Sequence, residues 1–413
     1  MIFCASAYTD LSRFLNPDGE KFMPGYYRGG QVDFSYPYLG ARAWLAGLNP
    51  YVNNDPRFTH EPFGVTIIEG TPYKQLYPPG HLITYLPLAL IYGADAVGAG
   101  RVMFHISLLC LFGLGFPIWR LLCKLRRESV SPFFLFAAVA PLMLYPGAQL
   151  GLERGQADMV TALMCWMAVV LLLRNAVAPA LFLAVWASSF KGYPAVFTEG
   201  LLLFSLRPGT WRSALLGFFA GVALFVAPAW RFLREALTGT LFRGKAYYFP
   251  GAYNHSFKSF VSSAISQPLA DPGRMVLALL ALGVTILWGW HGWQRRRDLS
   301  SPSGVLTLIL FATASLLLMI GVSVASISYN LILVLPGMLL LAVGQDQIVE
   351  MLHIGRVGAH VLGAAIVFCG FTLFLDAWYQ RFPLASVGLV GLLVLLAVLG
   401  VKMPRPTPAT PDG

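Results

Sequence analysis

The sequence predicts an all-α protein that crosses a membrane many times. Of its 413 residues, 57% are hydrophobic and 12% are charged, and the mean hydropathy is +0.65. Soluble domains carry about 25% charged residues, so a share this low indicates that lipid is the main solvent. Only helices and closed barrels can cross lipid, and because the apolar runs here do not alternate with polar residues, we expect helices.

Residues 1–80 contain no apolar run long enough to cross a membrane, and they are rich in polar, aromatic and turn-forming residues. Within them, apolar residues recur at helical spacing at positions 34, 38, 41, 45 and 48, which predicts an amphipathic helix over 34–47 that ends at Gly47. The following apolar run, 81–95, is shorter than the roughly 20 residues that a crossing helix needs. We therefore expect it to be an interfacial or re-entrant segment.

The rest of the chain holds about 11 expected transmembrane helices, three of them short. They lie at about 98–122, 132–148, 157–174, 177–190, 193–206, 210–231, 274–293, 303–326, 329–343, 357–379 and 384–402. The fourth and fifth are separated at the sequence KGYP, because Gly192 and Pro194 interrupt a helix there.

Basic residues predict which face of this bundle is cytoplasmic. With the spans above, the basic breaks all fall on one side; they hold Lys124, Arg126, Arg127, Arg174, Arg207, Arg212, Arg295, Arg296, Arg297, Lys402 and Arg405. Short loops rich in Lys and Arg favour the cytoplasm. Fusing 177–206 into one helix would separate Arg295–Arg297 from Lys124–Arg127. The net charge of +10 therefore orients the chain against anionic lipid, and we expect no nucleic-acid partner.

The same assignment of spans and orientation predicts the domain organisation. We expect one transmembrane domain over 1–402, with an outer catalytic loop at 1–97, a second outer loop at 232–273, and a disordered cytoplasmic tail at 403–413. The five cysteines show no ligand spacing, and the sequence has neither an Asp-x-Asp motif nor a nucleotide-binding glycine loop. We therefore expect no metal and no cofactor.

The unusual polar residues collect in the breaks that face outward. They are Asp33, Glu153, Arg154, Gln156, Asp158, Lys191, Tyr193, Asn254, His255, Lys258, Tyr329 and Asn330. A charge at mid-membrane costs roughly 2.5–3.5 kcal/mol on insertion scales, so such residues usually line a polar cavity. The helices after Gly155 and Pro194 point their N-termini outward, and such ends attract anions. Together these features predict a polar chamber on the outer face.

Each of these residues also has a purely structural interpretation. Asp33 fits a helix N-cap, and Arg154 fits a loop held by local ion pairs. Lys191 could extend its aliphatic stem past apolar neighbours and place its ammonium group in water. Lysines in that arrangement normally lie at the cytoplasmic rim, whereas the span assignment places Lys191 outside. The aromatic and basic stretch 242–260 fits an interfacial belt. These alternatives remain open from the residues alone.

Taken in order, the motifs resemble those of the GT-C superfamily of membrane glycosyltransferases, and most closely those of glycosyltransferase family 87. The likeness spans 31–336 and is carried by DFSYPYLGARAWLAGLNPY, YPPGHLITYLPLAL, LERGQAD, KGYP, YNHSF and YNLILVLP. It implies a GT-C-like bundle, a polyprenyl-phosphate-linked sugar donor, commonly mannose, and a catalytic Asp at Asp33. Two features depart from the family pattern: Asp158 stands where Asn is usual, and no span precedes Asp33.

The chemistry suits the residues themselves. Transfer from a sugar phosphate needs a base for the acceptor's proton and cations for the departing phosphate. Asp33 is the candidate base in an inverting single displacement, and the candidate donor phosphate-binding residues are Lys191, Arg154, His255 and Lys258. The candidate sugar or acceptor contacts are Glu153, Gln156, Tyr193, Asn254 and Tyr329. The expected partners are this donor, a lipid or glycan acceptor, and membrane lipids.

Two other classes of membrane protein share part of this pattern. A transporter also has broken helices and charges at depth, but internal symmetry is frequent there and no repeat is visible here. A flippase of a lipid-linked glycan is the related alternative. An early Asp paired with the YPPGHL segment favours the transferase, which we expect in a bacterial inner membrane with its active site facing outward.

Overall fold

The computed structural model describes residues 32–52, 55, 57, 78–192, 194–232, 234–235, 256–264, 267–323, 328–375 and 384–404. The regular structure in these ranges is entirely helical, as the sequence predicts. In chain order the helices that matter below are α2 Val32–Leu45, α3 Pro79–Tyr92, α4 Ala96–Gly113, α5 Gly115–Arg126, α6 Phe134–Leu144, α7 Pro146–Glu153, α8 Asp158–Leu173, α9 Val177–Lys191, α10 Ala195–Ser205 and α11 Trp211–Phe225. They are followed by α13 Phe257–Ala264, α14 Ala270–Gln294, α15 Pro302–Val322, the 3-10 turn η5 Ser328–Leu333, α16 Leu335–Val343, α17 Gln345–Met351, α18 Arg356–Leu375 and α19 Leu384–Lys402.

Several of these helices are long and apolar enough to cross a membrane. Five such stretches occur among the described residues: Ala96–Arg126, Gln267–Gln294, Pro302–Val322, Arg356–Leu373 and Ala385–Lys402. The shorter α8, α9, α10 and α11 are apolar too. The protein is therefore an integral membrane protein with multiple passes.

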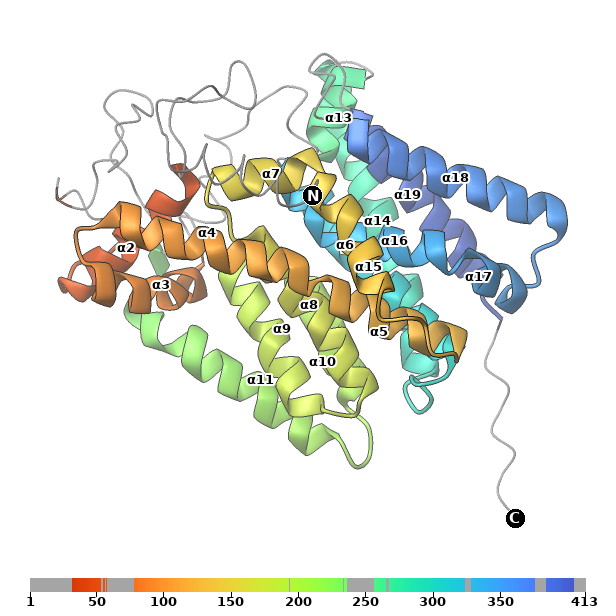
Figure 1. Ribbon diagram of the computed structural model, residues 1–413, viewed down its shortest axis with the longest axis horizontal. Helices are drawn as coiled ribbons and strands as arrows, with labels where there is room; N and C mark the ends of the chain where they lie inside the picture. Colours follow the sequence, from red (N-terminus) through yellow and green to blue (C-terminus); the bar gives the residue numbers. More distant parts are fainter. Residues whose placement is uncertain are drawn as a thin grey trace.

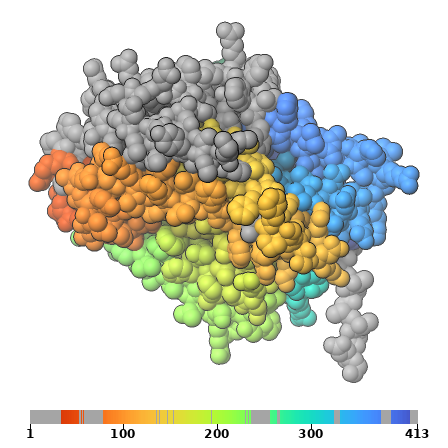
Figure 2. Space-filling model, in the orientation of Figure 1, coloured from red at the N-terminus to blue at the C-terminus, as the bar shows by residue number. Residues whose placement is uncertain are grey.

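The helices differ sharply in how much of their surface they bury, and this shows where the core lies. Of the most apolar 18 residues of α15, 89% are buried. The corresponding share is 28% in α18 and 33% in the stretch that contains α14. Figure 1 shows α8 to α11 beside α4 and α5, with α14 to α19 grouped on the other flank. Figure 2 shows the same division on the surface. The exposed apolar side chains of α14 and α18 suit contact with lipid.

Buried indole groups tie the core helices together. The Nε1 of Trp166 in α8 donates a hydrogen bond of 2.9 Å to the carbonyl of Leu333 in η5. The Nε1 of Trp288 in α14 donates one of 3.1 Å to the carbonyl of Leu396 in α19. A polar group buried in an apolar bundle needs such a partner, so these bonds fix the relative positions of helices that are distant in sequence.

Most expected spans coincide with helices, but the spans expected at 210–231 and 329–343 are not single α-helices. The first ends as α11 at Phe225, and the second begins with the 3-10 turn η5 before α16. The helix break at KGYP is confirmed: α9 ends at Lys191, Gly192 has a φ of +76°, and α10 begins at Ala195. The span expected at 132–148 is too long, because α6 ends at Leu144 and Tyr145 is extended. Pro146 has no N–H to continue the helix and instead opens α7.

Three further features differ from the sequence-based expectation. Part of the loop expected at 232–273 is helical, because α13 lies within it, and α17 follows α16 where no helix was expected. The helix predicted over 34–47 is α2, which begins at Val32, so Asp33 lies in its first turn rather than at its N-cap. Its predicted apolar face is buried at Phe34 and Tyr38, but Leu45 is 45% exposed because it sits at the helix end.

Candidate active site

The start of α2 lies against the link between α7 and α8. The chain turns there because Gly155 adopts a φ of +66°, a left-handed conformation that glycine tolerates best. The N–H of Gln156 closes the turn by donating to the carbonyl of Gly151 at 2.7 Å. The N–H of Phe34 donates to the carbonyl of Arg154 at 3.3 Å. This backbone contact brings the first turn of α2 beside the polar link.

The first ion pair of the site joins Asp33 to Arg154, 121 residues later in the chain. The Nη2 of Arg154 donates to Oδ1 of Asp33 at 2.9 Å, and its Nε donates to Oδ2. Both side chains are largely buried, with 11% and 12% exposed. Two parallel bonds between a guanidinium and a carboxylate fix the orientation as well as the distance, so Asp33 is held in one position.

The second ion pair joins Lys191, the last residue of α9, to Asp158, the first residue of α8. The Nζ of Lys191 lies 3.2 Å from Oδ2 of Asp158, and the two side chains are 3% and 0% exposed. Lys191 reaches this position because α9 ends at KGYP. A charge this deeply buried is stable only when it is paired, so each residue depends on the other.

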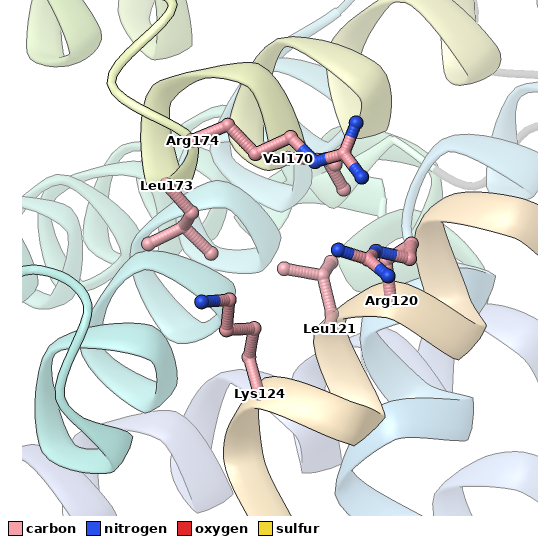
Figure 3. Close-up of a pocket in the computed structure, with 6 residues that line it drawn as sticks. All are labelled: Arg120, Leu121, Lys124, Val170, Leu173 and Arg174. Atoms are coloured by element: carbon pink, nitrogen blue, oxygen red, sulfur yellow. The ribbon is translucent and has the colours of Figure 1, made fainter. Parts of the chain in front are cut away.

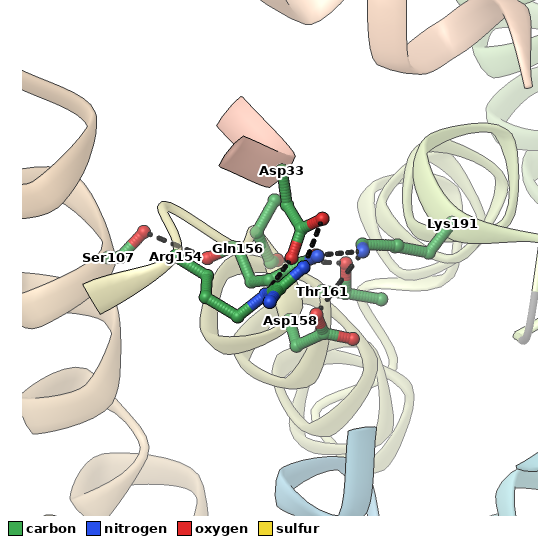
Figure 4. A network of polar contacts seen from close by, with 8 residues as sticks. Asp33, Ser107, Arg154, Gln156, Asp158, Thr161 and Lys191 are labelled. Carbon is green, nitrogen blue, oxygen red and sulfur yellow. Dashed lines mark hydrogen bonds and ion pairs between the residues drawn. The ribbon is translucent and has the colours of Figure 1, made fainter. Parts of the chain in front are cut away.

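Gln156 connects the two ion pairs (Figure 4). Its Oε1 accepts a hydrogen bond from Nζ of Lys191, and its side-chain amide is hydrogen-bonded to Asp33. Its carbonyl accepts a bond of 3.4 Å from Oγ of Ser107 in α4. The structure therefore brings Asp33, Arg154, Gln156, Asp158 and Lys191 into one network, which we call the charged cluster.

The charged cluster is balanced, with two carboxylates against two cations. Burial pushes the pKa of Asp33 upward, but the charge and hydrogen bonds of Arg154, the hydrogen bond of Gln156 and the charge of Lys191 outweigh it. The pKa of Asp33 therefore lies below its ordinary value of 3.8. In this arrangement the carboxylate is ionised, and its low affinity for a proton makes it a weak base.

One residue of this region escaped the sequence analysis. His81 of α3 is 2% exposed, and its ring centroid lies 4.3 Å from that of Phe190, next to Lys191. It lies in the YPPGHL motif. The sequence signal that could have pointed to His81 is the glycine that precedes it. A Cβ at Gly80 would lie 2.2 Å from Oγ of Ser189, so α3 and α9 must pack closely at this point.

Other predicted site residues are not part of the charged cluster. Lys258 of α13 pairs with Asp271 of α14 at 2.8 Å, on a more exposed surface. Tyr193, Asn254 and His255 lie outside the described residues. Glu153 ends α7 and Tyr329 lies in η5, but the side chains of both are outside the described part of the chain. Asn330, also in η5, is 1% exposed.

Comparison with known families decides the class of protein. The sequence profile of glycosyltransferase family 87 matches residues 76–312, more than half of the chain. The chain belongs to glycosyltransferase family 87. The matched range includes Arg154, Gln156, Asp158 and Lys191, but Asp33 precedes it. Family membership makes the protein a glycosyltransferase and sets aside the transporter alternative.

Two solved structures resemble the protein at low identity. The crystal structure of ArnT from Cupriavidus metallidurans bound to undecaprenyl phosphate is 14% identical, with a TM-score of 0.44, over 97% of this chain and 76% of that one. The apo state of the same protein gives a TM-score of 0.43 at the same identity and coverage. No curated protein matches the chain.

Proposed function

We propose that this glycosyltransferase moves a hexose, with mannose as the first candidate, from a polyprenyl-phosphate-linked donor to a hydroxyl of a lipid or glycan acceptor. The observation that supports this most directly is the charged cluster, where a carboxylate and two cations meet around Gln156. A sugar phosphate donor needs this combination of groups, because a proton must leave the acceptor while negative charge builds on the phosphate.

The reaction is a single displacement at the anomeric carbon. The acceptor oxygen forms a bond to that carbon as its proton passes to Asp33, and the bond from the carbon to the phosphate oxygen breaks with its electron pair. The donor is a phosphodiester with one negative charge, and the product is a polyprenyl phosphate monoester with more. Two cations at the phosphate therefore bind the transition state better than the donor, which is the condition for acceleration.

Arg154 has a second role in this proposal, which follows from its contact with Asp33. While Arg154 holds the carboxylate, the pKa of Asp33 is low and the group is a poor base. A donor phosphate offers the guanidinium an equally good bidentate partner. If Arg154 moves to the phosphate, Asp33 loses its strongest stabilising contact and its affinity for a proton rises. Donor binding then prepares the base for the acceptor.

Lys191 and Asp158 form the second half of the site. The Nζ of Lys191 already contacts Gln156, so a small movement would bring it to a phosphate beside Arg154. Asp158 balances the lysine when no donor is bound. An acid here, where the family pattern has Asn, forms an ion pair with the buried lysine, and this supports a role for position 158 in holding Lys191 rather than the sugar.

The orientation and extent of the catalytic domain are also part of the proposal. The basic residues Lys124 and Arg174 lie at the far end of α5 and α8 from Asp158, and short basic loops favour the cytoplasm. The charged cluster would then face outward from a bacterial plasma membrane, within a catalytic domain spanning residues 1–402. Lys258, His255, Asn254, Tyr193, Glu153 and Tyr329 stay as candidate contacts of the donor or acceptor.

Transfer by purified protein tests the proposal. Protein in liposomes would be incubated with radiolabelled polyprenyl-phosphate-mannose and a membrane lipid extract, with polyprenyl-phosphate-glucose and a nucleotide sugar in parallel. We expect a labelled glycolipid from a polyprenyl donor only. Asp33→Asn should lower the rate by roughly 100-fold or more while donor binding persists. Asp346→Asn, which changes an exposed acid of α17 away from the cluster, should not lower the rate. Transfer from the nucleotide sugar alone would contradict the proposal.

A further inference from the structure

A basic pocket lies between the last turns of α5 and α8, far from the charged cluster. It is lined by Arg120, Leu121, Lys124, Val170, Leu173 and Arg174. In Figure 3, Arg174 approaches from α8 while Arg120 and Lys124 approach from α5. Because α8 has 16 residues, a rise of about 1.5 Å per residue places Asp158 and Arg174 about 24 Å apart. The pocket and the candidate active site therefore lie toward opposite faces of the membrane.

The three basic side chains of the pocket make no side-chain hydrogen bond within the described ranges, which distinguishes them from Arg126 and Arg207 on the same face. No carboxylate within the described ranges lies within ion-pair distance of Arg120, Lys124 or Arg174. By contrast, Arg126 donates to the carbonyl of Val343 at 2.9 Å. Arg207 donates to Oδ1 of Asn175 at 3.1 Å. The charges of the pocket are thus not balanced by acids of the described chain.

The arrangement within the pocket favours an anion. Arg120 and Lys124 are four residues apart on one helix, so their like charges repel each other. Arg174 adds a third positive charge from the opposite side, while the buried Leu121 and Leu173 form an apolar floor. A group with a negative head and an apolar continuation would satisfy both parts of the surface.

The position of the pocket identifies the source of that group. Arg120 and Lys124 belong to the final turns of the apolar stretch Ala96–Arg126, which is long enough to cross a membrane. The end of such a helix lies at the level of the lipid headgroups. Basic pockets between membrane helices are suited to anionic headgroups. We propose that the pocket formed by Arg120, Lys124 and Arg174 binds the phosphate headgroup of an anionic phospholipid in the leaflet opposite the charged cluster.

Lipid binding to the purified protein tests this proposal. The protein in a neutral detergent would be titrated with phosphatidylglycerol, phosphatidylcholine or inorganic phosphate, and the bound lipid counted by native mass spectrometry. We expect phosphatidylglycerol to bind at a saturable site, with much weaker binding of phosphatidylcholine. Inorganic phosphate at the same concentration should not displace the lipid. Displacement by inorganic phosphate, or equal binding of phosphatidylcholine, would overturn the proposal.

Charge removal separates the pocket from the general attraction of a basic surface. Replacing Arg120, Lys124 and Arg174 together by Gln should weaken phosphatidylglycerol binding roughly 100-fold, because each basic residue near an anionic headgroup contributes about a factor of five. The matched control replaces Arg297, Arg356 and Lys402, three exposed basic residues outside the pocket. It should change the affinity of the site by less than about threefold. Equal losses in both triple variants would overturn the proposal.

A single substitution guards against a folding defect in the triple variant. Arg174 is exposed and follows the last residue of α8, so Arg174→Gln should leave the fold intact, as judged by circular dichroism and gel filtration. We expect about fivefold weaker binding of phosphatidylglycerol in this variant. Unchanged binding would remove Arg174 from the site. The readout is lipid binding, so the result does not depend on which sugar or donor the protein uses.

Discussion

At the scale of single residues, the central feature is that each cation of the charged cluster is paired with an acid. Arg154 holds Asp33, and Lys191 lies beside Asp158. A phosphate must therefore compete with a carboxylate for each cation. This competition links the affinity for donor to the basicity of Asp33, and it makes predictions that a simple cation pocket would not.

The pH dependence of transfer should differ between the free enzyme and the donor complex. Without donor, the pKa of Asp33 lies below 3.8, so kcat/KM for the donor should fall only when the pH drops below that value. With donor bound, Arg154 is drawn to the phosphate and the pKa of Asp33 rises, so the acidic limb of kcat should lie at higher pH. The acidic limb moves to higher pH because a base is active only when deprotonated, and a higher pKa means that Asp33 is protonated at higher pH.

The matched variant for this measurement is Arg154→Gln. It removes the charge that lowers the pKa of Asp33, so the acidic limb of kcat/KM should move upward toward the limb of kcat. The acidic limbs of kcat and kcat/KM could instead coincide in the unaltered protein and stay in place in Arg154→Gln. That result would show that Arg154 does not set the pKa of Asp33.

The buried pair of Lys191 and Asp158 should show strong coupling in stability. Lys191→Met alone leaves Asp158 unpaired where it is 0% exposed, which should cost about 3–5 kcal/mol of unfolding free energy. The double variant Lys191→Met with Asp158→Leu removes both charges and should recover most of that loss. Reversible denaturation in detergent would measure the cycle.

Activity should not follow stability in that cycle. The double variant lacks one of the two cations at the phosphate, so its affinity for donor should stay low although the fold has recovered. Lys258→Met, which breaks a more exposed pair with Asp271, serves as the control and should change stability by less than about 1 kcal/mol. Near-normal donor affinity in the double variant would show that Lys191 does not bind the donor phosphate and has only a structural role.

At the scale of helices, the site depends on the close approach of α3 to α9. Gly80 makes this possible, since a Cβ there would lie 2.2 Å from Oγ of Ser189 and 2.8 Å from its carbonyl carbon. Gly80→Ala should push the helices apart just before Lys191. We expect a loss of about 1–3 kcal/mol in stability and a marked loss of donor affinity, measured by thermal unfolding and ligand titration.

The control for Gly80→Ala is another helical glycine with open space around it. Gly283 lies within α14, and a Cβ there would meet no atom within 4 Å. Gly283→Ala should be neutral or stabilise the helix by about 0.5–1 kcal/mol. Equal effects of the two substitutions would show that close packing at Gly80 does not position the site.

Sequence reasoning predicted the helices well but not the partners within the site. The break at KGYP followed from Gly192 and Pro194, because their local preferences outweigh the surrounding apolar residues. The pairing of Arg154 with Asp33 did not follow, since 121 residues separate them and Glu153 lies nearer in sequence. Which acid a cation meets depends on helix packing, and packing is not visible in local composition. His81 was missed for the same reason.

At the scale of the whole molecule, the two ends of α14 should face opposite sides of the membrane. The helix has 25 residues, about 38 Å, which exceeds the thickness of the hydrocarbon core. In a background without the five native cysteines, Gln267→Cys should react with an impermeant maleimide added outside the cell. Arg297→Cys should react only after the membrane is permeabilised. The reverse pattern would invert the proposed orientation of the active site.

A structure with a donor analogue tests most directly whether phosphate replaces the carboxylate at Arg154. The analogue would be a polyprenyl phosphonate in which carbon replaces the oxygen between sugar and phosphorus, so that transfer cannot occur. We predict that Arg154 and Lys191 will contact the phosphonate oxygens and that Asp33 will be released toward the anomeric carbon. If the phosphonate binds away from both cations, or if Arg154 still holds Asp33 in the complex, the account is contradicted.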